Sequence, residues 1–161
     1  MMRTEIRKIT PKDNAAMARI IREVMPEFGA SGPGFAIHDP EVDDLCTAYS
    51  HDRSAYYVCV VNGMIIGGAG IAPLKGGDAK TCELQKMYLL PSSRGKGYGR
   101  TLLDMCLKSA REFGYRRCYI ETFSTMNTAI GLYERTGFTR IDSPMGSTGH
   151  FACNTFYMLD L

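Results

Sequence analysis

Three glycines and two cations form a short run near the middle of the sequence, Arg94-Gly95-Lys96-Gly97-Tyr98-Gly99. Glycine adopts unusual φ/ψ angles and lets a ligand approach the backbone closely. The run stands directly before a stretch with helical periodicity, and the first turn of a helix offers unpaired N–H groups and a partial positive charge. Together with the side chains of Arg94 and Lys96, these features predict an anion site suited to a phosphate or pyrophosphate.

Three phosphate-binding designs compete for this run. A P-loop is excluded, because a glycine rather than Ser or Thr follows the lysine. A dinucleotide-binding turn requires G-x-G-x-x-G; Gly95 and Gly97 match, but Arg100 stands at the third place. Glu121 does lie at a suitable distance for a ribose contact, roughly 20 residues further on. The third design, Arg/Gln-x-x-Gly-x-Gly/Ala between a strand and a helix, is matched in full. A glycine-rich turn with solvated charges is the remaining alternative.

A strand before the run and a helix after it must position these groups. Residues 83–90 (ELQKMYLL) are predicted to be a strand that ends at Pro91, since proline has no N–H for the ladder. Gly114 suits the C-cap of the following helix. The apolar residues of that helix recur at three- and four-residue spacing: Leu102, Leu103, Cys106, Leu107 and Ala110.

The remaining pattern predicts an α+β (α/β mixed) sheet in one domain over residues 1–161. Further strands are expected at 2–9, 54–61, 64–72, 117–123, 138–141 and 150–159, and helices at 11–26, 41–50 and 127–135. Asn62-Gly63 is a strong hairpin signal, and the glycines at 67, 68 and 70 mark a bulge or a close backbone approach. Because a helix crosses between strands 83–90 and 117–123, these two should be parallel neighbours.

Composition excludes several function classes. The 161 residues suit one domain with a sizeable core. The formal net charge is +2, and basic runs are confined to residues 94–100 and 116–117, which does not indicate a nucleic-acid surface. No apolar run reaches the roughly 18 residues of a membrane span, and the N-terminus is too charged for a signal peptide. A cytoplasmic protein without a nucleic-acid or membrane partner is expected.

The cysteines and histidines show no metal-ligand spacing. The three histidines are far apart in the sequence, so no metal is expected. The six cysteines contain no C-x-x-C pair and favour buried free thiols, which fits a reducing cytoplasm. They are Cys46, Cys59, Cys82, Cys106, Cys118 and Cys153.

Two sequence blocks resemble one enzyme family. Arg94, Gly97 and Gly99 are placed as in the pyrophosphate loop of the GNAT family of N-acetyltransferases. Residues 127–138 (NTAIGLYERTGF) are similar to the N-x-x-A-x-x-x-Y-x-x-x-G-F pattern that follows the fifth strand in these enzymes. The predicted elements match over nearly the whole chain and match least over 28–50 and 142–155. The resemblance implies a mostly antiparallel GNAT-like acyl-CoA N-acyltransferase fold, with a splayed parallel central strand pair and flanking helices.

The resemblance also implies a cofactor, acetyl-CoA, and the residues that would hold it. The glycine run would bind the pyrophosphate through backbone N–H groups, and the pantetheine arm would pair with the backbone of Met87 and Leu89, in the manner of an added strand. Asn127 would contact the cofactor or cap its helix. The expected cofactor-binding residues are Met87, Leu89, Arg94, Gly95, Lys96, Gly97, Tyr98, Gly99 and Asn127.

Two residues are expected to carry the chemistry implied by the resemblance. Tyr133 would protonate the departing thiolate; its alternative is a tyrosine packed on the sheet. Glu83 would be the general base, often through water, with Glu121 and His150 as further candidates. Cys153 is expected to pack rather than attack, because a nucleophilic cysteine needs a nearby base. In a strand, His150 would lie on the opposite face from Cys153, three residues away.

The predicted function is therefore an acetyl-CoA-dependent N-acetyltransferase that uses direct attack by a primary amine of a small molecule or peptide. Residues 28–40 (FGASGPGFAIHDP) read either as a connection between helices or as a wall of the acceptor site, and residues 142–150 are expected to face the same end of the cleft. The alternatives are a nucleotide-binding oxidoreductase and a coenzyme A-binding sensor without turnover. A homodimer is expected from family habit alone.

Overall fold

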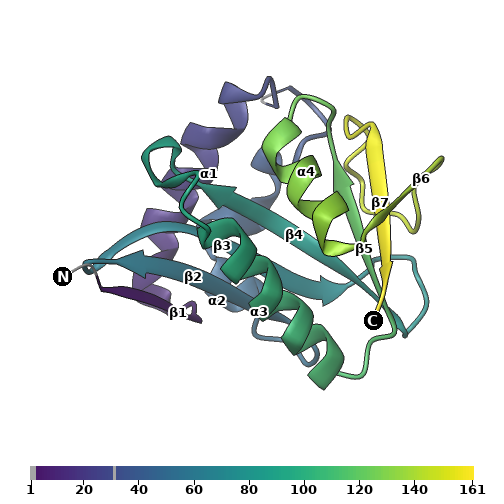
Figure 1. The fold of residues 1–161 in the computed structure, drawn as a ribbon, viewed down its shortest axis with the longest axis horizontal. Helices are drawn as coiled ribbons and strands as arrows, with labels where there is room; N and C mark the ends of the chain where they lie inside the picture. Colours follow the sequence, from purple (N-terminus) through teal and green to yellow (C-terminus); the bar gives the residue numbers. More distant parts are fainter. Residues whose placement is uncertain (1–2, 31) are drawn as a thin grey trace.

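A computed structural model describes residues 3–30 and 32–161, and its centre is one seven-stranded sheet (Figure 1). The order in the sheet is β1-β2-β3-β4-β5-β7-β6. All neighbours are antiparallel except β4 and β5, which are parallel as predicted. The strands are β1 (Thr4–Lys8), β2 (Ala55–Val61), β3 (Met64–Pro73), β4 (Thr81–Leu89), β5 (Arg117–Thr122), β6 (Thr139–Ile141) and β7 (Thr155–Asp160).

Helices cover both faces of the sheet and create two apolar layers. The longer helices are α1 (Asn14–Glu27), α3 (Tyr98–Glu112) and α4 (Asn127–Thr136); α2 (Leu45–Ala48) is one turn. Side chains of α3 and α4 pack with Tyr57 and Cys59 of β2, whereas side chains of α1 and α2 pack with Tyr56 and Val58. Successive strand residues point to opposite faces, so β2 is apolar along almost its whole length. The short 3-10 turns are η1 (Pro11–Asp13), η2 (Ala36–His38), η3 (Pro40–Asp43) and η4 (Pro91–Ser93).

The predicted hairpin and the glycine-rich strand are confirmed. Asn62 and Gly63 both have positive φ, 51° and 80°, as a two-residue type I′ turn requires. In β3, a Cβ at Gly68 would lie 2.6 Å from the ring of Tyr56, so only glycine fits there. The pairing of β3 with β4 shifts register between Gly68 and Gly70. This irregularity is the bulge that the glycines indicated.

Two distortions of β4 shape the site. Lys86 has a φ of 50°, a left-handed conformation that is uncommon for residues other than glycine, and it lies in the stretch of β4 where the pairing with β3 shifts register. The parallel pairing of β4 with β5 covers only Thr81–Glu83 opposite Arg117–Tyr119. Beyond Glu83 the two strands diverge and leave one edge of β4 unpaired with β5. The splayed parallel pair implied by the family resemblance is therefore present.

Two predicted elements differ from the structure. The last strand begins at Thr155, so His150 and Cys153 lie in a loop, where the Cys153 N–H donates to the His150 carbonyl at 3.0 Å and closes a turn. The expectation that they lie on opposite faces of a strand is therefore wrong. The predicted helix at 41–50 is divided into η3 and α2, because the Asp44 side chain caps a new helix by accepting from the Thr47 N–H. Among the described residues, no helix has the length and apolar composition that a membrane crossing requires.

Candidate active site

The glycine run forms the turn between β4 and α3. Gly95 and Gly97 have φ values of 75° and 87°, and Gly97 is the N-cap of α3, so both positions use the freedom of glycine. Gly99 already lies in the helix and its φ is not positive. A Cβ there would lie 3.5 Å from side-chain atoms of Leu89 and Leu132, an ordinary contact distance. Gly99 therefore leaves space beside the helix start rather than permitting a turn.

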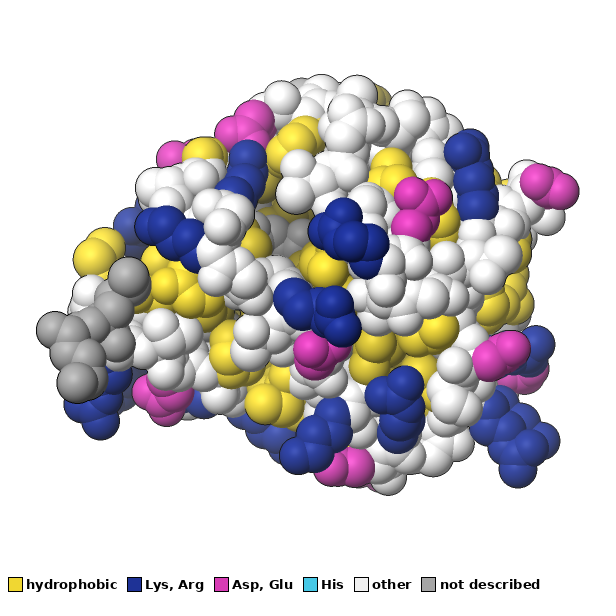
Figure 2. Space-filling view, viewed as in Figure 1, with side chains coloured by type: hydrophobic (Ala, Val, Ile, Leu, Met, Phe, Trp, Pro, Cys, Tyr) yellow, Lys and Arg dark blue, Asp and Glu magenta, His cyan; other side chains and the backbone are white. Residues whose placement is uncertain are grey.

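A cavity of about 270 Å³ lies against this turn, and we call it the glycine-loop groove. Figure 2 shows the molecule hollowed between the N-terminal end of α3 and α4, with basic side chains at the rim. Lys96 and Asn127 are exposed and do not line the groove. Met126, not Asn127, is the N-cap of α4, so the predicted capping role of Asn127 is wrong. The other predicted cofactor-binding residues line the groove: Met87, Leu89, Arg94, Gly95, Gly97, Tyr98 and Gly99.

The Arg94 guanidinium braces the turn. Its Nε and Nη2 atoms donate to the Leu89 carbonyl at 3.2 and 3.0 Å, and its Nη1 lies 2.6 Å from a carboxylate oxygen of Glu27. It also lies 5.1 Å from the ring centroid of Phe28. The arginine thus ties the end of β4 to the end of α1. Arg100 and Arg135, which were not among the predicted cofactor-binding residues, also line the groove.

The unpaired edge of β4 runs along the groove. The Leu90 N–H donates to the Ile66 carbonyl of β3 at 2.9 Å, so Leu90 and Tyr88 direct their backbone groups to β3. Backbone direction alternates along a strand, so Met87 and Leu89 direct theirs into the gap between β4 and β5. The Leu89 carbonyl accepts the bonds from Arg94. An extended ligand in this gap meets the strand-like backbone edge that was predicted at Met87 and Leu89.

A second, smaller cavity of about 50 Å³ adjoins the groove, and we call it the polar cavity. Met87, Tyr88 and Met126 line both cavities, so the two meet at the middle of β4. The polar cavity is also lined by Phe35, Glu83, Gln85, Glu121, Tyr133, His150 and Cys153. Both predicted catalytic residues and every candidate base therefore face one space.

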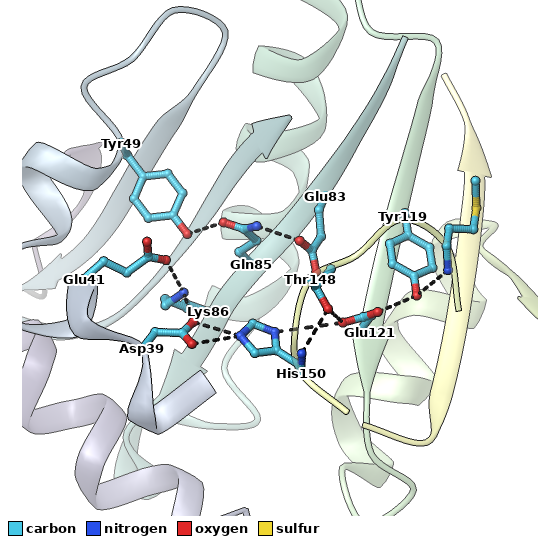
Figure 3. A network of polar contacts seen from close by, with 11 residues as sticks. Asp39, Glu41, Tyr49, Glu83, Gln85, Lys86, Tyr119, Glu121, Thr148 and His150 are labelled. Atoms are coloured by element: carbon cyan, nitrogen blue, oxygen red, sulfur yellow. Dashed lines mark hydrogen bonds and ion pairs between the residues drawn. The ribbon is translucent and has the colours of Figure 1, made fainter. Parts of the chain in front are cut away.

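Glu83 is buried in this cavity and its pKa is raised to about 7. Burial is the main cause, and the nearby Glu121 carboxylate adds to it, while the hydrogen bond from Gln85 opposes it. The Gln85 Nε2 atom donates to Glu83 Oε1 at 2.6 Å, and the Tyr49 hydroxyl donates to Gln85 Oε1 at 2.6 Å (Figure 3). At neutral pH the carboxyl group is close to half ionised, which suits a group that must take and release a proton.

Glu121 and His150 complete a cluster with Glu83. One ligand atom from each of the three residues lies within 4.8 Å of the others. Glu121 accepts hydrogen bonds from the Tyr119 hydroxyl at 2.8 Å and from the Thr148 hydroxyl. Carboxylates and imidazole are also metal-ligand types, and the fold brings together a set that the sequence spacing did not indicate. In this structure the two carboxylates are held by hydrogen-bond donors of the protein.

Lys86 stands behind this cluster as a buried cation, its side chain only 2% exposed. Its Nζ lies 3.0 Å from Asp39 Oδ2 and 2.6 Å from Glu41 Oε1. Asp39 also accepts from His150 Nε2 at 2.9 Å. Burial disfavours the Asp39 carboxylate, but His150 and Lys86 outweigh this and lower its pKa. The hydrogen bond to Asp39 in turn raises the pKa of His150 against the effect of burial.

These pairs join two loops that are far apart in the sequence. Asp39 belongs to the loop before η3 and His150 to the loop before β7, and the Ala152 N–H donates to the Gly34 carbonyl at 3.3 Å. Phe35 and His150 both line the polar cavity. Residues 34–39 and 150–152 thus meet at the polar cavity. That the loops at 28–40 and 142–150 form walls of an acceptor site stays a prediction. Sequence reasoning missed Lys86, because a lysine within a strand reads as a solvent-facing residue.

Tyr133 lines the polar cavity and packs its ring in the core. Its ring centroid lies 5.9 Å from that of Phe138 and 6.3 Å from that of Tyr157. Burial raises its pKa, so the phenol keeps its proton at neutral pH. Its hydroxyl makes no hydrogen bond with the residues that the structure describes. Cys153 is half-buried, and burial raises its pKa to about 12, so it is a thiol rather than a reactive thiolate.

Comparison with known proteins identifies the fold and the family. The model of the acetyltransferase (GNAT) family matches residues 17–138. The chain is 45% identical over 157 residues to YjgM of Escherichia coli (strain K12), described as an uncharacterized N-acetyltransferase, and the match covers 97% of this chain and 94% of YjgM.

Solved structures share the whole architecture. A GNAT-family acetyltransferase from Staphylococcus aureus Mu50 superposes with a TM-score of 0.82 at 20% identity, covering 98% of this chain and 99% of the other. The yncA protein of Salmonella typhimurium, solved with its cofactor acetyl-CoA, gives a TM-score of 0.77 at 23% identity, covering 98% and 93%. At these identities the likeness concerns the fold alone.

The dinucleotide alternative is excluded, because its fold needs a mostly parallel sheet and this one has a single parallel pair. The family match spans most of the chain, and its E. coli relative spans nearly all of it. The chain belongs to the acetyltransferase (GNAT) family and is an acyltransferase.

Proposed function

We propose that this enzyme transfers an acetyl group from acetyl-CoA to a primary amine by direct attack. The observation that carries the proposal is the meeting of the two cavities at Met87 and Tyr88. A donor that lies along β4 in the glycine-loop groove presents its thioester where the polar cavity begins. Glu83 and Tyr133 both line that cavity, so a proton acceptor and a proton donor flank the same point.

The groove supports the donor assignment. Its turn combines the left-handed glycines Gly95 and Gly97 with the first-turn N–H groups of α3, a site that favours a pyrophosphate. The unpaired edge of β4 at Met87 and Leu89 suits the amide groups of pantetheine. The yncA protein, which shares the fold, was solved with acetyl-CoA. In this assignment Arg94 acts mainly by holding the turn in shape.

The chemistry follows from the protonation states. Glu83, with a pKa of about 7, accepts a proton from the amine. The amine nitrogen forms a bond to the thioester carbon, and the tetrahedral intermediate breaks its C–S bond. Tyr133, with its raised pKa and free hydroxyl, gives its proton to the departing thiolate. A covalent intermediate on Cys153 is disfavoured, because its thiol has a pKa of about 12.

A panel of amine acceptors tests the proposed transfer. A panel of n-butylamine, spermidine, a peptide with a free α-amine and a peptide with a free lysine side chain tests the proposal directly. Each is incubated with acetyl-CoA, and both coenzyme A and the acetylated amine are quantified by liquid chromatography with mass detection. Equal amounts of the two products are expected for at least one amine.

A Glu83→Gln variant serves as the matched control, because it keeps the size and shape of the side chain. It is expected to lose most of the turnover while binding coenzyme A normally. Coenzyme A release without an acetylated amine, across a broad amine panel, would contradict the proposed transfer. Turnover by Glu83→Gln equal to that of the parent enzyme would remove Glu83 from the mechanism.

A further inference from the structure

We propose that Gln85, itself held by Tyr49, is a positioning residue for Glu83. The chain of two hydrogen bonds would fix the carboxylate so that Oε1 is occupied and Oε2 is left for the acceptor amine. The hydrogen bonds are features of the structure; their importance for catalysis rests on the proposed function of Glu83 as the base.

The pair of hydrogen bonds begins at Tyr49, a tyrosine whose ring is tightly packed. Tyr49 is buried at the end of α2, and its ring lies 5.2 Å from that of Tyr56. A Cβ at Gly70 would lie 2.8 Å from the Tyr49 ring, so a glycine of β3 makes room for it. From this position the Tyr49 hydroxyl donates to Gln85 Oε1 at 2.6 Å.

Gln85 uses both ends of its side-chain amide, one toward Tyr49 and one toward Glu83. Its oxygen accepts from the Tyr49 hydroxyl, and its Nε2 donates to Glu83 Oε1 at 2.6 Å. An amide rotated by half a turn would instead present an oxygen, which only a protonated carboxyl group tolerates. In the orientation that the structure shows, the bonds to Tyr49 and to Glu83 are made together, and the amide stabilises an ionised Glu83.

The hydrogen bond from Gln85 matters because the other groups around Glu83 have opposing effects on its charge. Burial and the Glu121 carboxylate disfavour its charge, whereas His150 and Lys86 favour it. Asp39 and Glu41 are already paired with Lys86, which reduces what that cation offers. Gln85 is the neutral group that directly contacts the carboxylate and stabilises its charged form. Losing it should make the base harder to ionise.

The direct test measures the Glu83 carboxyl group without any acceptor. In protein labelled with ¹³C at the glutamate side-chain carboxyl, the Glu83 signal is assigned by its disappearance in Glu83→Gln and followed through a pH titration. Gln85→Met removes the donor at similar volume, and Tyr49→Phe removes only the hydroxyl. Each is expected to raise the midpoint by about one pH unit, the size of one lost hydrogen bond to a charged group.

Tyr57→Phe is the matched control. Its hydroxyl is also buried and lies 2.5 Å from the Ser109 hydroxyl, but on the α3 side of the sheet. It should lose stability without moving the Glu83 midpoint. If the midpoint in Gln85→Met and Tyr49→Phe stays at the parent value while both variants are folded, the positioning proposal is overturned. A shift of equal size in Tyr57→Phe would also overturn it, because the effect would then reflect general loosening.

Kinetics separate this proposal from the proposed function. With whichever panel amine is acetylated, kcat/KM at pH 6 should be about tenfold lower in both variants than in the parent enzyme, while the plateau at high pH and KM for acetyl-CoA are unchanged. A shifted titration midpoint together with an unshifted rate profile keeps the hydrogen-bond chain but shows that Glu83 is not the base. An unshifted titration midpoint of Glu83 rejects the positioning role of Gln85 and Tyr49, whatever the rate profile shows.

Discussion

At the scale of single residues, Tyr133 combines a structural and a chemical feature. Its ring packs against Phe138 and Tyr157 in the core, and the residue lines the polar cavity together with Glu83. A phenol with a raised pKa is a weak acid, but a thiolate in a poorly solvated site is a strong proton acceptor. The two features can be separated by a substitution that keeps the ring.

Tyr133→Phe is expected to lower kcat by roughly 10²–10⁴-fold, the usual contribution of a general acid. Stability and coenzyme A affinity should change little, since the ring contacts remain. KM for the donor should be nearly constant, as expected for an interaction made in the transition state. Steady-state kinetics with a panel amine and calorimetry with coenzyme A measure these quantities.

An acyl donor with a more acidic thiol provides the control for Tyr133. Its leaving group needs less protonation, so the variant should recover part of the lost rate with this donor. A kcat equal to that of the parent enzyme, with chemistry rate-limiting, would make Tyr133 a packing residue. A collapse of donor affinity would make its role binding instead.

The raised pKa of Glu83 predicts how the rate of the reaction depends on pH. The base must be ionised in the free enzyme, so kcat/KM should fall as pH drops below about 7, with a slope of one proton. The raised pKa places this limb well above the usual range of a glutamate. A Glu83→Gln variant should lose the limb along with most of the rate. A limb near pH 4.5 in the parent enzyme would mean that the base is solvated during turnover.

The residues around Glu83 show where sequence reasoning ends. Glu83 and Tyr133 were predicted from their places in a family pattern. Gln85 and Lys86 were not, because their roles depend on the irregular pairing near Lys86 and on contacts with Tyr49 and Asp39, which are remote in the sequence. A pattern of residue types along a strand cannot show which buried partner each polar side chain meets.

At the scale of elements, the turn between β4 and α3 has two kinds of glycine. Gly97 has a φ of 87°, where a side chain is strained at about 1–2 kcal/mol. Gly99 is helical and has room for a Cβ. Gly97→Ala should therefore lower both stability and coenzyme A affinity. Gly99→Ala should keep or slightly raise stability. Thermal unfolding and calorimetry with coenzyme A measure the two effects.

The valine variants sharpen the comparison of Gly97 with Gly99. Gly97→Val and Gly99→Val are both expected to abolish coenzyme A binding, because a branched side chain fills the approach to the backbone N–H groups. Gly97→Val acts in addition through backbone strain, because its φ is positive, whereas the φ of Gly99 is not positive. Unchanged affinity in a folded Gly97→Val protein would place the pyrophosphate elsewhere.

The elements themselves were largely predictable, and the failures have local causes. Hydrophobic periodicity located α3, and Asn62-Gly63 located the β2–β3 hairpin. The start of β7 was misplaced because residues 150–154 contain strand-like residues, yet Gly149 has a φ of 81° and the local Cys153–His150 bond forms a turn. The loop then joins Asp39 instead of the sheet, a contact that no local pattern encodes.

At the scale of the whole molecule, the sheet organises both cavities around β4. β3 pairs with one edge of this strand from Cys82 to Leu89, interrupted by the register shift near Lys86, but β5 pairs with the other edge only up to Glu83. The divergence begins where the polar cavity lies, and the open edge continues to the turn at α3. The parallel pair was predictable from the sequence, whereas the length over which two strands stay paired depends on packing of the whole sheet.

The open edge gives a prediction that separates neighbouring amides. The N–H groups of Met87 and Leu89 face the gap, so they should exchange with deuterium readily in the free enzyme. If the pantetheine arm pairs with them, coenzyme A should slow their exchange strongly. The Leu90 N–H already donates to Ile66 and should be protected both with and without the ligand. Hydrogen exchange followed by NMR resolves these amides individually.

The pattern of protection discriminates between specific pairing and general tightening. Coenzyme A stabilises the folded state by mass action, which slows exchange through global unfolding at every amide by the same factor. Pairing along the edge adds protection at Met87 and Leu89 beyond that factor, and strand alternation leaves Tyr88 between them without it. A fragment of coenzyme A that lacks pantetheine, such as 3′-phospho-ADP, should protect the amides at the start of α3 but not those of Met87 and Leu89. Equal protection of all these amides by the fragment would mean that the arm does not lie along β4.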